Sequence, residues 1–174
     1  FFATYASVDG YDPYKNKVNY IDFSIMDKWI ISKLNVFIRD CNSSLEQFRS
    51  DIMMRKFDLF LDDLSNWYIR RSRRRFWKSE DDLDKQTAYQ VLYECLTTVI
   101  KLISPVLPFV TEEIYQNLVK NIDSDEHESI HLCDYPSSDL KKIDIELMKN
   151  IDSLRRVVEL GRSARNKAKI KIRQ

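Results

Sequence analysis

The sequence predicts an all-α protein, a bundle of about five helices preceded by an irregular N-terminal strap. Two observations carry this prediction. Apolar residues recur at steps of three and four along most of the chain, and strand-like alternation is confined to "SIHLC" and "IKIRQ". The 174 residues, 44% of them hydrophobic, are enough for one domain with a core. No apolar run approaches the roughly 20 residues that span a bilayer, so we expect a soluble chain.

The first predicted helix follows a segment without helical period. Residues 1–23 mix aromatic side chains with Gly10 and Pro13, and are expected to form a connecting strap. Ser24 and Asp27 have the spacing of a capping box, which predicts a helix start. The apolar stripe behind it comprises Ile30, Leu34, Phe37, Ile38, Cys41, Leu45 and Phe48.

Two further helices are expected to fold back on each other. The stripe of the second leads into a run of arginines and comprises Met53, Phe57, Phe60, Leu61, Leu64 and Tyr68. Ser79 and Asp82 form another predicted capping box, which opens the third helix. Its inward stripe comprises Ala88, Val91, Leu92, Cys95, Leu96, Val99, Leu102 and Ile103.

Two helices complete the predicted bundle. Pro105 and Pro108 are expected to end the third helix, and Thr111 to cap a short one, "TEEIYQNLVK". The last helix is expected from about Ser138 to about Lys167. Its predicted inward residues are Ile143, Leu147, Ile151, Leu154 and Val158.

The formal net charge of +1 conceals a separation of sign. Residues 66–78 and 161–174 each hold six Lys or Arg and no acid, so the rest of the chain sets 16 bases against 27 acids, a net charge of −11. Two acid-free basic tracts on an otherwise acidic protein favour an anionic partner, RNA or DNA. The alternatives are a solvated basic face and a surface that docks an acidic protein.

The first tract, "NWYIRRSRRRFW", holds five arginines within six positions. At 100° per residue from Phe57, Arg71 and Arg75 continue the inward stripe, where charge is tolerated only when it is paired. We therefore expect both to reach carboxylates of the bundle. The same phase turns Asn66, Arg70, Arg73 and Trp77 toward water, with Arg74 in between. Outward guanidinium forks suit phosphate, and Trp77 offers a face for an unpaired base.

Other motifs favour neither catalysis nor metal binding. His127, Glu128 and His131 match H-E-x-x-H, but zinc chemistry needs a helix there, and the motif lies between an acidic loop and Pro136. With two glycines in the chain, no glycine-rich phosphate loop can form. The three cysteines, Cys41, Cys95 and Cys133, have no C-x-x-C pair and favour a reducing, cytosolic setting. Membrane docking is disfavoured because the apolar stripes are needed to close the bundle.

Five blocks, in order, resemble the anticodon-binding domain of isoleucyl-tRNA synthetases: "MDKWIISKLN", "DDLSNWYIRRSRRRFWKSEDD", "ISPVLPFVTEEIYQNL", "SIHLCDYP" and "ELGRSARNKAKIKIRQ". Valyl, leucyl and methionyl enzymes have looser counterparts, so the same domain of a valyl- or leucyl-type enzyme is the alternative. The resemblance implies residues 1–23 as a connecting segment from the catalytic body and residues 24–174 as the anticodon-binding bundle. Because the chain lacks an initiator Met and a signal peptide, it is interpreted as an excised fragment.

The resemblance also implies a function. The parent enzyme is a ligase that uses ATP with Mg to attach isoleucine to tRNA, whereas this fragment would hold no catalytic site, cofactor or metal. Its implied partners are the anticodon arm of tRNA(Ile) and the catalytic body of the same polypeptide, in a cytoplasmic monomer without a membrane. The implied tRNA-binding residues are Asn66, Arg70, Arg73, Arg74, Trp77, Lys78, Arg162, Arg165, Lys167 and Lys169.

Overall fold

The computed structural model describes residues 1–15, 17–77, 83–123 and 125–170. Within these ranges it is helical without a strand, which confirms the all-α prediction. The helices are α1 (Phe2–Asp9), α2 (Ile25–Glu46), α3 (Ser50–Asp62), α4 (Arg70–Phe76), α5 (Leu83–Ile103), α6 (Pro108–Tyr115) and α7 (Ile145–Lys167). Two π-helical segments, Asp63–Ile69 and Gln116–Lys120, and three short 3-10 turns, Tyr20–Asp22, Ile130–Leu132 and Leu140–Lys142, join them.

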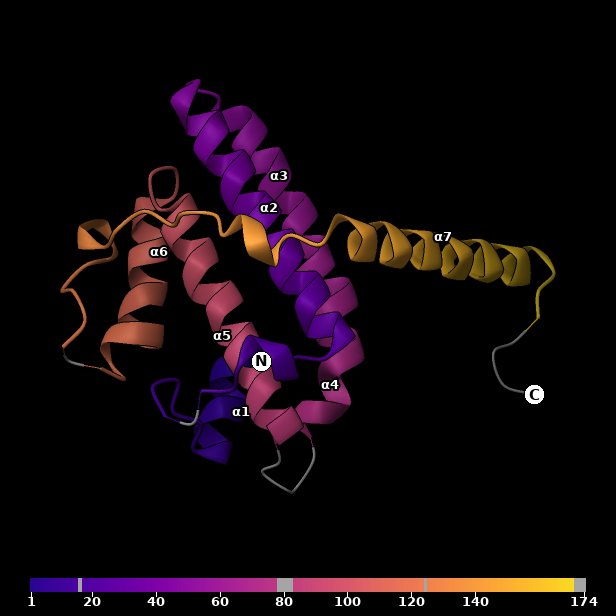
Figure 1. Ribbon diagram of the computed structural model, residues 1–174, viewed down its shortest axis with the longest axis horizontal. Coiled ribbons are helices and arrows are strands. Elements are labelled where there is room, and N and C mark those ends of the chain that lie inside the picture. The colour runs from indigo at the N-terminus through magenta and orange to yellow at the C-terminus, as the bar shows by residue number, and fades with distance from the viewer. Residues whose placement is uncertain (16, 78–82, 124, 171–174) are drawn as a thin grey trace. The chain divides into compact units, whose positions relative to one another are not determined.

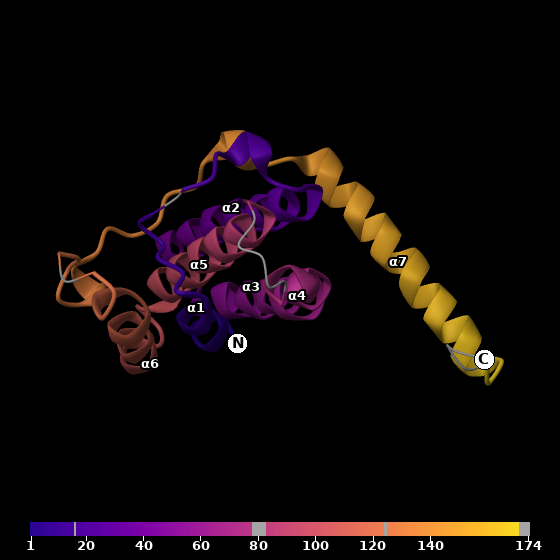
Figure 2. The ribbon, with the colours of Figure 1, turned by 90° about the horizontal axis from the view of Figure 1, so that it is seen from below.

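The chain divides into two compact units, residues 1–143 and the residues from Asp144 onward. In the first unit α2 and α3 lie side by side, and α5 packs against α2, α4 and α6 (Figure 1). Figure 2 shows α1 beside α5, where Phe2 contacts the rings of Tyr89 and Tyr93 at centroid distances of 6.0 and 5.9 Å. None of the described helices has both the length and the apolar character to cross a membrane.

The N-terminal strap is more regular than its sequence predicts. Residues 2–9 form a helix that ends at Gly10, which adopts the left-handed conformation with φ of 64°. This helix is short and its apolar residues are not segregated to one side, so apolar periodicity in the sequence does not reveal it. Burial of Phe2 and Ala6 against the bundle stabilises a helix that is too short to be stable alone.

The capping box at the start of α2 is confirmed, since Ser24 Oγ accepts from Asp27 N at 3.2 Å and the Asp27 carboxylate accepts from Ser24 N at 3.1 Å. The predicted stripe of α2 is buried from Ile30 to Cys41. Phe48 is not: α2 ends at Glu46, and Phe48 lies in the following turn with a φ of 55° and its side chain exposed.

Two other helix starts differ from the prediction. Helix α6 begins at Pro108, whose missing N–H is tolerated in a first turn. Thr111 is therefore inside the helix and donates from its hydroxyl to Leu107 O at 2.8 Å. Helix α7 begins at Ile145, because Asp144 accepts from Leu147 N at 2.8 Å and caps it. The predicted capping box of Ser79 and Asp82 lies outside the described residues.

The predicted inward residues of α7 are only partly buried. Ile151 is buried and Leu147 and Val158 are half-buried, but Leu154 is half exposed.

The structural cysteines Cys41 and Cys95 are buried free thiols, as their apolar stripes predict, and burial raises the pKa of Cys41 to about 12.

Candidate nucleic-acid interface

The arginine-rich tract lies at the end of one long helical rod. Helix α3, the π-helical segment Asp63–Ile69 and α4 follow one another with right-handed helical backbone angles at both junctions. A π-helix bonds each N–H to the fifth residue before it, so its turns hold more residues than those of an α-helix. Side chains after the segment are therefore rotated from the positions that an unbroken α-helix would give them.

The inner side of this rod carries large apolar groups and two buried polar residues, Asp63 and Ser72. Leu64, Trp67 and Tyr68 are buried in the π-helical segment, and Ser72 and Phe76 in α4. The ring of Phe76 meets that of Tyr89 on α5 edge to face, with 5.0 Å between centroids. These contacts hold α4 against α5, and the arginines occupy the rest of its circumference.

Four arginines of α4, namely Arg70, Arg71, Arg73 and Arg74, are exposed. Within the described part of the chain, no carboxylate lies within ion-pair distance of any of them. The exposed Trp77 follows, 53% accessible, and the Arg73 guanidinium lies 5.3 Å from its ring centroid. Like charges held this close repel one another, so the array favours an anion that neutralises it.

Arg75 is the exception and confirms the prediction of an inward partner. Its guanidinium binds the buried Asp27 carboxylate with both outer nitrogens, at 2.7 and 2.9 Å, and its Nε lies 2.8 Å from Asp84 Oδ1. Burial lowers the pKa of Arg75, but its hydrogen bonds and charge contact with Asp27 outweigh burial and raise that pKa above the usual value. Arg75 is therefore a structural cation.

The prediction for Arg71 is wrong, because Arg71 is exposed and pairs with no described carboxylate. Its guanidinium instead lies 4.5 Å from the ring centroid of Trp67, one helical turn earlier. The π-helical segment explains the error, since it shifts the phase on which the inward assignment rested. The sequence did contain a signal: Trp and Arg at a spacing of four are neighbours on any α-helical surface.

The remaining predicted residues of this tract lie near the array or outside the described residues. Asn66 is exposed in the π-helical segment, and its amide donates to Asp62 at 2.7 Å. Lys78 lies outside the described residues. The outward side of Asn66, Arg70, Arg73 and Trp77 agrees with the predicted phase, although their contacts with RNA stay a prediction.

The second basic tract belongs to the second unit. Arg162 and Lys167 are exposed on the last turns of α7, and Lys169 is exposed just after its end. Arg165 is half-buried. Cations at a helix C-terminus are favoured by the helix dipole, so their placement has a structural reason that is independent of binding.

The H-E-x-x-H motif does not have the geometry of a zinc site. The two histidines of that motif must lie one turn apart on a helix, but His131 is in a 3-10 turn and His127 precedes it in irregular chain. Glu112 holds this segment by accepting from Ser129 Oγ at 2.8 Å and from Ile130 N at 3.0 Å. Among the described residues, no group of His, Cys, Asp and Glu is arranged to hold a metal ion.

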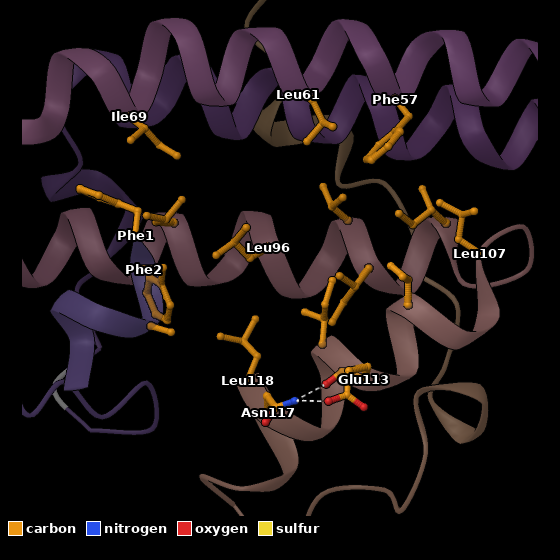
Figure 3. Close-up of a pocket in the computed structure, with 17 residues that line it drawn as sticks. Phe1, Phe2, Phe57, Leu61, Ile69, Leu96, Leu107, Glu113, Asn117 and Leu118 are labelled. Carbon is orange, nitrogen blue, oxygen red and sulfur yellow. Dashed lines mark hydrogen bonds between the residues drawn. The ribbon is translucent and has the colours of Figure 1, made fainter.

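An apolar groove of about 590 Å³ lies in the first unit between α1, α3, α5 and α6 (Figure 3). Its polar side chains are Glu113 and Asn117, and the Asn117 amide donates to the Glu113 side chain at 3.0 Å. Phe57 of α3 lines it together with Phe1 and Leu107, which directly precede α1 and α6 (Figure 3). With one carboxylate and no nucleophile or basic group, the groove has no constellation for acid–base or nucleophilic chemistry.

Comparison with known proteins agrees with this geometry. The sequence profile of a family described as "Anticodon-binding domain of tRNA ligase" matches residues 27–174. The whole chain is 46% identical to isoleucine–tRNA ligase of Clostridium novyi and 47% identical to that of Dehalococcoides mccartyi, and it spans 17% of each. It is 41% identical to isoleucine–tRNA ligase of Chlamydia pneumoniae, of which it spans 16%. Because the family match covers most of the chain and includes all the helices from α3 to α7, the protein belongs to the family of anticodon-binding domains of tRNA ligases.

Proposed function

We propose that this chain is the tRNA-binding part of an isoleucine–tRNA ligase, and that the outward arginines of α4 grip the phosphate backbone of the tRNA(Ile) anticodon arm. One observation carries the proposal: Arg70, Arg71, Arg73 and Arg74 are exposed together, without a carboxylate partner among the described residues. The identity to isoleucine–tRNA ligases supports the choice of tRNA.

The geometry favours specific binding of phosphate groups over a diffuse layer of small counterions. A guanidinium is planar and presents paired N–H groups that match two phosphate oxygens. Arg71 over Trp67 and Arg73 over Trp77 are stacked on rings, which restricts their motion while leaving the N–H edges available. Less side-chain entropy is then lost on binding. The half-exposed ring of Trp77 also offers a surface on which an unpaired loop base can stack.

The basic residues Arg162, Arg165, Lys167 and Lys169 provide further phosphate contacts from the second unit in this proposal. They follow one another within about two helical turns, so their charges are close together. A protein that neutralises more phosphates binds more tightly at low salt and loses affinity more steeply as salt rises. These residues therefore add mainly to affinity rather than to discrimination between sequences.

In the parent polypeptide, binding energy from the anticodon arm would place the distant 3′ end of the tRNA for aminoacylation with isoleucine in the cytoplasm. Such a ligase uses ATP with Mg, but the residues described here do not fit either group. They form no metal-holding cluster, and the two glycines of the sequence cannot build a glycine-rich phosphate loop. The proposal therefore has no catalytic step in this chain, which we expect to act as a monomer.

The test is the affinity for an isoleucine-tRNA anticodon stem-loop between 50 and 300 mM salt, measured by fluorescence anisotropy. The four arginines of α4 alone predict a log–log slope of about −3 to −4, and every phosphate contact from the second unit makes the slope steeper. Stem-loops from valine and leucine tRNAs, in the same series, separate an isoleucine enzyme from a valyl- or leucyl-type one. Absence of binding at the lowest salt, or affinity independent of salt, contradicts the proposal and leaves an acidic protein partner as the alternative.

A further inference from the structure

The carboxylate of Asp27 joins the start of α2 to the arginine-bearing rod. Its side chain is fully buried, with 0% accessibility. Ser24 donates to Asp27 Oδ2 from its backbone N at 3.1 Å and from its hydroxyl at 2.6 Å. Tyr68 Oη donates to Oδ1 at 2.5 Å, and Arg75 donates to both oxygens at 2.7 and 2.9 Å. One carboxylate therefore receives five hydrogen bonds from three residues, which lie before α2, in the π-helical segment and in α4.

The two contacts from the rod restrict its rotation. Tyr68 belongs to the end of the π-helical segment and Arg75 to α4, so the carboxylate contacts the rod at two positions, about two turns apart. Arg75 binds as a planar fork, which fixes direction as well as distance. Its other edge meets Asp84, through Nε at 2.8 Å from Oδ1 and through an outer nitrogen that donates to Asp84 O at 3.1 Å. The two outer nitrogens are thus hydrogen-bonded, whereas Nε is held by its ion pair with Asp84 and has no hydrogen bond among the described residues.

Because Asp27 is buried, its carboxylate selects which arginine of α4 faces inward. A buried carboxylate is costly unless its charge and lone pairs are satisfied, so a rotation of α4 that removes Arg75 is strongly disfavoured. Five arginines within six positions offer alternative partners of the same charge. Arg75 is the one that sits on the same carboxylate as Tyr68, and with it fixed inward the other four face solvent. The interior carboxylate therefore determines which arginines form the outer array.

We infer that Asp27 is a positioning residue for RNA binding: without touching RNA, it sets the rotation of α4 through Arg75 and Tyr68 and so presents Arg70, Arg71, Arg73 and Arg74 together. This inference rests on the proposed function of the array. The role is distinct from helix capping, because a cap alone would stabilise α2 without affecting the direction of side chains on α4.

Asp27→Asn tests this inference by the sign of its effect. The substitution removes a negative charge near the arginines, so electrostatics alone predicts tighter RNA binding. Positioning predicts weaker binding, by roughly tenfold for the stem-loop, with a shallower salt slope because fewer arginines engage at once. The measurement is made well below the melting temperature of the variant, where circular dichroism shows it to be folded.

The matched control is Leu102→Ala. Leu102 is fully buried near the far end of α5, about 28 Å along that helix from its first residue. It lowers stability without altering the Asp27 contacts, so its stem-loop affinity is expected to stay within twofold of wild type. Unchanged or tighter binding by Asp27→Asn, or a loss no larger than that of Leu102→Ala, overturns the inference. If Asp27→Asn does not fold, Tyr68→Phe decides: we expect a smaller loss of affinity, and wild-type affinity contradicts positioning.

A second readout needs no RNA. The edge-to-face contact of Phe76 with Tyr89 gives a nuclear Overhauser effect that reports how α4 sits on α5. We expect Asp27→Asn to lose or weaken it and Leu102→Ala to keep it. If wild type fails to bind the stem-loop, the proposed function fails, whereas the Phe76–Tyr89 signal still tells whether Asp27 orients α4. A signal that is unchanged in Asp27→Asn overturns the inference whatever the RNA result.

Discussion

Replacing Arg75 by alanine should destabilise the protein far more than replacing Arg71, although both are arginines of one short helix. Arg75 is 14% accessible and its partner Asp27 is fully buried. Removing one member of a buried ion pair leaves the other charge uncompensated, which costs about 3–5 kcal/mol. In a chain of this size, 1 kcal/mol corresponds to about 2–4 °C in melting temperature. Arg75→Ala should therefore lower the melting temperature by roughly 6–20 °C.

Replacing Arg71 by alanine should destabilise the protein much less. Its one described interaction is the contact over Trp67, and an exposed cation–π pair contributes about 0.5–1 kcal/mol. Arg71→Ala should lower the melting temperature by roughly 1–4 °C. Thermal unfolding followed by circular dichroism at 222 nm, in one buffer, compares the two variants directly. An Arg71→Ala loss as large as that of Arg75→Ala would mean that the rotation of α4 described here is incorrect.

Three further predictions concern binding, pH and the loop after α6. Arg71→Ala should weaken stem-loop binding and reduce the salt slope by about one unit, measured by anisotropy; an unchanged slope would exclude Arg71 from the interface. Burial raises the pKa of Asp27, but hydrogen bonds from Arg75, Ser24 and Tyr68 outweigh burial and hold that pKa below 3.8. The ionised Asp27 therefore stabilises the folded protein fully above about pH 4, and this stabilisation is lost as the pH falls through the folded-state pKa. Urea unfolding from pH 6 to pH 3 should show this loss in wild type and a smaller one in Asp27→Asn; equal losses would count against it. Glu112→Ala should destabilise the protein by about 1–3 kcal/mol, because Ser129 Oγ and Ile130 N lose their acceptor, and hydrogen exchange at Ile130 should accelerate; an unchanged exchange rate would contradict this role.

Periodicity and capping predict most of the first unit. The stripe of α2, the end of α5 before Pro105 and the buried cysteines follow from apolar spacing and from the geometry of proline, which are local properties. Helix starts were less predictable where two residues compete. Thr111 resembles an N-cap, but Pro108 three residues earlier is suited to a first turn and begins the helix instead.

The sequence predicts only part of the candidate site. Arg75 could be placed because an unpaired charge is not tolerated on an inward face. Arg71 was misplaced because spacing alone does not reveal a π-helical segment, and the resulting rotation is enough to move Arg71, at the border of the predicted stripe, out to solvent. Asp27 both caps α2 and pairs with Arg75, and this second role depends on a contact between residues 48 positions apart. Such contacts arise from packing, which local pattern does not encode.

The exposed arginines of α4 are the centre of this account, and charge reversal tests them most directly. Arg70→Glu with Arg73→Glu is compared with Arg39→Glu plus Arg55→Glu, a control pair on α2 and α3 that changes the net charge equally. The measurement is the dissociation constant for the isoleucine-tRNA anticodon stem-loop at 100 mM salt. We expect a loss of affinity of about 100-fold or more for the α4 pair and a much smaller one for the control. Equal losses would show that net charge alone drives binding, and no loss would show that α4 does not contact RNA.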